Sequence, residues 1–364
     1  MKKSVLILAA VTGILFWGCT KTDSFNSMSS SLKQSVSTGI TAVNNAVGTI
    51  STSKGFEVLN ANSVAMKSEV TYTDSVTLAS VAGIYDFKPD LFHFYDFFIP
   101  HRLFVKTGTS SEMIVNLPGK LVMHPRFLRE LNAPDSLLKN NFTIKASDYY
   151  FYFNFLNKFD YRLAAGFTLD TIDIGHMEIT SSAEPTIQSY TSSYAFPGGY
   201  AISVSSQRTD TIVNTFTLSK EGNVLMEETV IVAPPQHGTV MEEGTGEDHE
   251  FRHREHLYML TIGNVEIKRG GGLDSIQVFL NGVLQKHAGA RIIDSTGTDG
   301  SIMHKRDILI TFDDGTTTNL STLLDPAKEA LKTLVDALHS MNFAKNIVDY
   351  IAIGIDYDMH HDHD

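Results

Sequence analysis

Cysteine is nearly absent from this sequence, since Cys19 is the only one among 364 residues. It stands directly behind an apolar run, in the stretch LFWGCTKTD at 15–23. An unpaired thiol in an oxidising compartment calls for a specific explanation, because free thiols there tend to form disulfides. The rest of the chain has no second cysteine, which excludes a cysteine nucleophile in its body.

Positive charge is also scarce, with 29 Lys and Arg against 41 Asp and Glu and a net charge of −12. Nucleic-acid binding requires clustered Lys and Arg to neutralise phosphates, so the composition argues against a nucleic-acid partner. The sequence has no G-x-x-x-x-G-K-[ST] or G-x-S-x-G motif, and no G-x-G-x-x-G follows a predicted strand. Nucleotide binding and serine-hydrolase chemistry therefore lack their usual sequence signals.

The N-terminus has the order of a secretory signal. Two lysines precede an uncharged apolar run from Val5 to Trp17, which is shorter than the roughly 20 residues that a membrane-spanning helix needs. Gly18 and Cys19 follow this run. The stretch resembles the lipobox of bacterial lipoproteins, in which the cysteine is acylated and becomes the mature N-terminus. The resemblance covers residues 1–19 only.

This resemblance implies a lipid-anchored protein of the cell envelope, with residues 1–18 as signal peptide and Cys19 as the lipid attachment site. Each buried methylene contributes about 0.8 kcal/mol, so two or more acyl chains hold a protein stably at a membrane. Residues 19–28 are polar and Ser-rich, and we expect them to form a tether. The expected partner through Cys19 is a membrane, and the expected location is the outer membrane, on its periplasmic or surface side.

The body of the chain begins with a helical pattern and continues with strand patterns. Residues 29–60 form a predicted N-terminal helix and linker, because apolar residues from Leu32 to Ile50 recur every three or four positions. Beyond residue 60 the segments are β-branched and aromatic, and short turns such as Lys220–Asn223 are typical of hairpins. The predicted class is mainly β (α+β), an antiparallel sheet sandwich or half-barrel with one N-terminal and one C-terminal helix.

Two β-rich units are predicted, over residues 61–187 and 196–364. The boundary between them falls at 183–199, which carries Pro, Gly and Ser, although a long loop inside one sandwich has the same composition. The second unit includes a C-terminal helix at 326–346, with Asp325 at its N-cap and Pro326 at its first position. The stretch IVDYIAIGIDY that follows is predicted to return to a strand.

One short motif combines residue types that commonly bind metal ions in proteins. His249, Glu250 and His253 satisfy H-E-x-x-H, which resembles the zincin metalloprotease signature of two zinc-binding histidines and a general-base glutamate. The charged neighbours lack the apolar flank of a zincin helix, and His256 occupies the position where the metzincin extension has glycine. The match is therefore interpreted as coincidental, and no enzymatic activity is predicted.

A metal-binding surface is the milder alternative for segment 247–256. Its ligands are His249, His253, His256 and Glu250, and Zn²⁺ is the candidate cofactor because imidazole suits it. A solvated segment that binds metal only incidentally has the same composition.

The second candidate site is aromatic. In DYYFYFNFLNKFDY, residues 148–161, alternate side chains point to opposite faces of a predicted strand, so both faces are aromatic. The candidate ligand-binding residues are Phe151, Phe153, Phe155, Tyr150 and Tyr152. Such a strand either lies centrally, covered on both faces, or lines a cavity or patch for a lipid, a glycan or a protein partner.

Together these patterns predict a membrane-anchored extracytoplasmic lipoprotein that acts as a binding or structural module for an apolar or glycan ligand. A metal-binding surface protein is the second hypothesis, and a zinc-dependent hydrolase ranks last.

Overall fold

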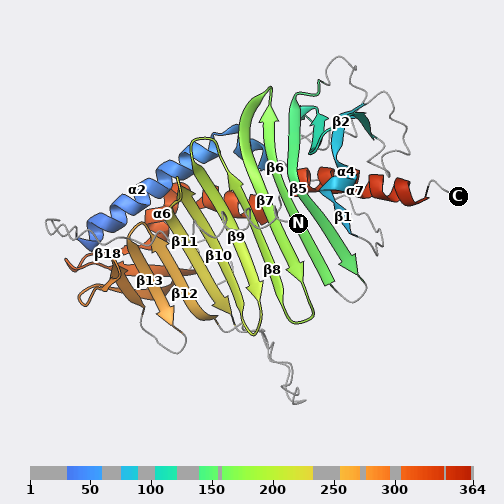
Figure 1. The fold of residues 1–364 in the computed structure, drawn as a ribbon. Coiled ribbons are helices and arrows are strands. Elements are labelled where there is room, and N and C mark those ends of the chain that lie inside the picture. Colours follow the sequence, from blue (N-terminus) through green and yellow to red (C-terminus); the bar gives the residue numbers. More distant parts are fainter. Residues whose placement is uncertain are drawn as a thin grey trace, which may run out of the picture. The chain divides into compact units, whose positions relative to one another are not determined.

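A large open sheet dominates the structure, a computed structural model, and helices pack against one of its faces (Figure 1). The strand order is β15-β14-β13-β12-β11-β10-β9-β8-β7-β6-β5-β4-β2-β3, and β1 pairs with β5. All neighbouring pairs are antiparallel except β2 and β4, which are parallel. The mainly β class predicted from the sequence is confirmed.

The structure describes residues 31–59, 75–88, 103–120, 139–154, 158–232, 255–270, 276–295, 305–339 and 342–361. The sheet strands are β1 Val76–Thr77, β2 Gly83–Phe87, β3 Phe104–Gly108, β4 Met113–Leu117, β5 Phe142–Asn154, β6 Lys158–Leu169, β7 Ile172–Ala183, β8 Gln188–Ala195, β9 Tyr200–Arg208, β10 Ile212–Lys220, β11 Asn223–Val232, β12 Glu255–Ile262, β13 Val265–Gly270, β14 Gln277–Leu280 and β15 Val283–Leu284. A second sheet has the order β16 Gly289–Ser295, β17 Lys305–Thr311 and β18 Thr317–Asn319. The helices are α2 Leu32–Ser51, α3 Lys54–Leu59, α4 Leu78–Val81, α6 Leu320–His339 and α7 Asn342–His361.

Tight turns build the meander. Strands β10 and β11 are joined by Glu221 and Gly222, whose φ angles of 51° and 80° fit the type I′ turn that matches the twist of a hairpin. This is the turn that the sequence predicts at Lys220–Asn223.

Residues 183–199, predicted as a domain boundary, instead contain the end of β7, its turn and the whole of β8. These two strands pair in one hairpin of the continuous sheet, and the described residues from Leu32 onward form one compact unit.

Helix α2 confirms the apolar stripe predicted near the N-terminus. Its buried side chains include Val36, Ile40, Val43 and Val47, which lie on one side of the helix. A Cβ atom added to Gly39 would lie 2.8 Å from Cγ2 of Ile262 on β12. Glycine therefore occupies this helical position because α2 crosses the sheet too closely for a side chain.

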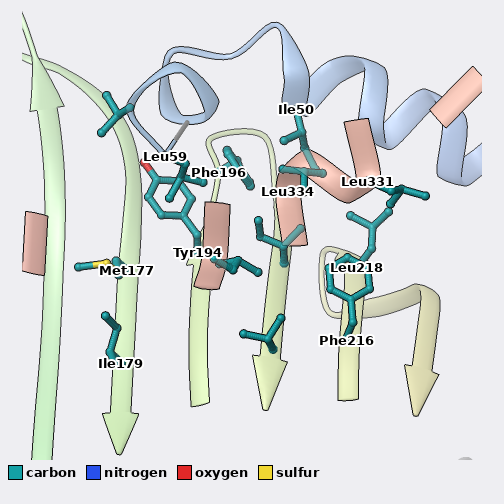
Figure 2. Close-up of a cluster of buried hydrophobic side chains, with 14 of the residues drawn as sticks. Ile50, Leu59, Met177, Ile179, Tyr194, Phe196, Phe216, Leu218, Leu331 and Leu334 are labelled. Carbon is teal, nitrogen blue, oxygen red and sulfur yellow. The ribbon is translucent and has the colours of Figure 1, made fainter. Parts of the chain in front are cut away.

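The core lies between the sheet and its helices. Figure 2 shows part of it, where Ile50 of α2, Leu59 of α3 and Leu334 of α6 meet side chains from β7, β8 and β10. Tyr194 of β8 is almost fully buried there and donates a hydrogen bond to the backbone oxygen of Ile174. Burying large apolar side chains at about 25 cal/mol per Å² is the main force that holds the helices to the sheet.

The C-terminal region differs from the prediction of one helix at 326–346 followed by a strand. Helix α6 begins at Leu320, and a second helix, α7, follows it. In IVDYIAIGIDY the isoleucines at 351, 353 and 355 fall at every second position, which fits a strand. The spacing of Val348, Ile351 and Ala352 also fits a helix, and these three residues are buried. Both periods are present in the sequence, and packing selects the helical one.

Candidate functional site

A cavity of about 470 Å³ lies where the large sheet, strand β17 and helix α6 meet. Its lining residues are Met226, Glu228, Tyr258, Leu260, Asp307, Ile308, Leu320, Ser321, Leu324 and Lys328. Aliphatic and aromatic side chains dominate the walls, with a few polar groups among them. This is the composition of sites that bind small molecules, which are typically 300–1,000 Å³ in volume.

Strand and helix geometry bring these residues together. Met226 and Glu228 are two positions apart on β11 and therefore share a face. Leu260 on β12 is the direct partner of Glu228 in the sheet register, which makes a continuous floor. Leu324 and Lys328 follow one another at a spacing of four residues on α6, so they form one wall.

Asp307 connects β17 to the beginning of α6. Its Oδ1 accepts hydrogen bonds from the backbone N–H groups of Ile308 at 2.8 Å and Ser321 at 3.1 Å. Its Oδ2 accepts a further bond from the Ser321 hydroxyl. A carboxylate here accepts a hydrogen bond from a free N–H group of the first helical turn. Its negative charge also interacts favourably with the positive end of the helix dipole. Asp307 thus holds α6 in place beside the cavity.

The two other charged residues of the cavity differ in their surroundings. Glu228 is half-buried and has an interaction partner within the chain. Lys328 is exposed, and no ion pair links its Nζ to a carboxylate anywhere in the described part of the chain. Lys328 is therefore the charged group at this cavity that remains available to a ligand.

A separate polar cluster lies under α7, away from the cavity lining. Tyr161 of β6 donates a hydrogen bond to Oδ1 of Asp349 at 3.0 Å, and Lys345 donates to Oδ2 at 2.5 Å. The Lys345 ammonium also lies 4.6 Å from the centre of the Tyr161 ring. These contacts join one turn of α7 to the sheet.

Burial controls the titration of this cluster. It raises the pKa of Asp349, although the Lys345 charge and the hydrogen bonds favour the ionised form. Burial and the nearby Asp349 carboxylate raise the pKa of Tyr161 well above its usual range. Burial and the same carboxylate raise the pKa of Tyr350 to about 12. The cluster acts as a polar attachment of α7 inside an apolar layer.

The aromatic residues predicted as a ligand site lie on β5, and none of them lines the cavity. Phe151 packs edge-on against Phe159 with ring centres 6.0 Å apart, on the face that α7 covers. Phe153, on the same face, is 37% exposed near the strand end. A register shift between Ala146 and Asp148 determines which alternate residues face the helices.

The opposite face of β5 carries the two remaining tyrosines. The Arg162 guanidinium lies 5.0 Å from the ring centre of Tyr150, and the Tyr152 hydroxyl accepts a hydrogen bond from Asn154. Phe155 lies outside the described residues.

The predicted metal ligands His249, Glu250 and His253 lie outside the described residues, as does Cys19. The backbone of His256 lies in β12, which begins at Glu255. Within the described ranges, no three His, Cys, Asp or Glu side chains are grouped closely enough to hold a metal ion. The described helices include none that is long and apolar enough to cross a membrane.

Sequence reasoning missed the cavity. Its residues come from segments near positions 226, 258, 307 and 324, and each segment alone reads as an ordinary strand or helix. One available signal was Asp307, the acid that begins the largely apolar stretch DILITF.

The chain matches no known family model, no curated protein and no solved structure.

Proposed function

We propose that this protein is a lipoprotein of the cell envelope, anchored through an acylated Cys19, whose folded body binds a small, largely apolar ligand. The observation that carries the binding proposal is the cavity of about 470 Å³ with its aliphatic walls. The anchor proposal is supported by the order of charged, apolar and small residues that precede Cys19.

Apolar walls favour a ligand that removes hydrocarbon from water. Leu260 and Leu320 are buried, while Leu324 and Ile308 are half-buried beside them and present apolar surface to the cavity. Each ligand methylene that enters such a site contributes about 0.8 kcal/mol before the costs of association are subtracted. The few polar groups at the margin would set the orientation of the ligand.

Binding of a neutral dye tests this proposal. N-phenyl-1-naphthylamine fluoresces more strongly in apolar surroundings. We expect saturable binding to the Cys19→Ser chain without residues 1–18, which carries neither the apolar leader nor acyl groups that could bind the dye. Leu324→Trp fills the cavity and is expected to weaken dye binding at least tenfold.

The matched control is Leu323→Trp, because Leu323 is the half-buried neighbour on α6 that does not line the cavity. Equal loss of binding in both variants, with both still folded by circular dichroism, would count against the cavity as the site. Absence of saturable binding to the parent chain would remove the proposed function.

A further inference from the structure

The charges around the cavity are not equivalent, and their differences define the kind of ligand head group that fits. Three charged residues line it, namely Glu228, Asp307 and Lys328. Both carboxylates already have partners in the chain: Asp307 accepts three hydrogen bonds from residues 308 and 321, and Glu228 also has an interaction partner. The Asp307 carboxylate is thus stabilised by donors of the chain and by the N-terminal end of α6, whereas Lys328 has no such partner within the described residues.

Lys328 differs in position as well as in charge. It follows Ser321 by seven residues on α6, which places it about 10 Å further along the helix axis from the end that Asp307 caps. Leu324 lies between them on the same wall, and no carboxylate pairs with Lys328 within the described residues. The wall therefore has a capped acidic end, an apolar middle and an exposed cationic end.

We infer that the cavity selects an anionic single-chain amphiphile, whose hydrocarbon lies against Leu324 and Leu260 and whose acidic head group pairs with Lys328. This inference rests on the proposed function and adds the charge and orientation of the ligand. An exposed ion pair contributes up to about a fivefold difference in affinity, so Lys328 orients the ligand more than it holds it.

Three ten-carbon probes of different charge test the inference by displacing N-phenyl-1-naphthylamine from the Cys19→Ser chain at pH 8. Decanoate carries a negative head group, decan-1-ol a neutral one and decyltrimethylammonium a positive one. In Lys328→Gln we expect decanoate to bind about two- to fivefold more weakly, decanol to be unchanged and decyltrimethylammonium to bind more tightly. The decanoate effect should shrink at high salt, because exposed charges are screened.

Lys332→Gln is the matched control, because it removes the same charge one helical turn further along α6 from a residue that does not line the cavity. It should leave all three affinities unchanged. Equal effects of the two lysine variants, or an effect of Lys328→Gln that is the same for all three probes, would overturn the inference while the cavity remained the binding site. If none of the probes displaces the dye, the proposed function itself fails.

Discussion

The acidic side chain under α7 gives a sharp prediction about stability and pH. Asp349 is buried between α7 and the sheet, where Tyr161 and Lys345 are its partners. Its pKa is raised by burial, so over some range above the usual value near 4 the folded protein keeps this carboxyl protonated while the unfolded chain ionises it. The contribution of Asp349 is therefore fully present below about pH 4 and is lost as the pH rises through the folded pKa.

The perturbation is Asp349→Asn, which keeps the shape and an acceptor for Tyr161 but cannot titrate. The free energy of unfolding of the parent chain, minus that of the variant, is expected to fall as pH rises from about 4. The steepest slope is about 1.4 kcal/mol per pH unit, the value for one proton. Above the folded pKa the difference becomes constant, at a lower value than the one below pH 4.

Urea denaturation followed by circular dichroism between pH 3.5 and 8 measures this difference, because all other groups titrate in both chains. Lys345→Met should extend the sloping range to higher pH, since it removes the charge that favours ionised Asp349. A difference that stays flat, or that grows in favour of the parent as pH rises, would mean that the ion pair balances or outweighs burial and would refute the reasoning.

Three further predictions follow from single residues. Gly39→Ala should destabilise the fold by about 1 to 2 kcal/mol, because the new Cβ overlaps β12. Gly48→Ala on the same helix meets open space and should stabilise the fold by up to about 1 kcal/mol. Urea denaturation measures both changes. Asp307→Ala should cost about 1 to 2 kcal/mol by uncapping α6, while a similar loss in the exposed Asp313→Ala would contradict that role. Cells grown with a radioactive fatty acid should label the parent chain and not Cys19→Ser, and absence of label from the parent chain would argue against the anchor.

Local patterns in the sequence predicted those parts of the fold that local physics determines. Helical periodicity alone predicts the stripe of Val36, Ile40 and Val43. The turn at Glu221–Gly222 follows from a glycine, which readily adopts a positive φ angle, between two strand patterns. The strand alternation of β2 and β4 was equally direct, since each shows alternate buried and half-buried residues.

The remaining features depend on contacts between distant segments. Helix α6 begins at Leu320 because Asp307, 14 residues before Ser321, caps its first turn. Helix α7 forms where a strand pattern was equally visible, and Tyr161, 188 residues before Asp349, contacts it there. The cavity arises between four such segments, so no single stretch of sequence carries its pattern.

Crystals of the Cys19→Ser chain grown with 10-bromodecan-1-ol test the central claim most directly, because bromine is located by its anomalous scattering and the neutral ligand does not depend on Lys328. We predict one dominant bromine peak within the cavity, in contact with Leu260, Leu320 or Leu324. A dominant peak elsewhere, such as beside the exposed ring of Phe153 on β5, would contradict the assignment of the binding site.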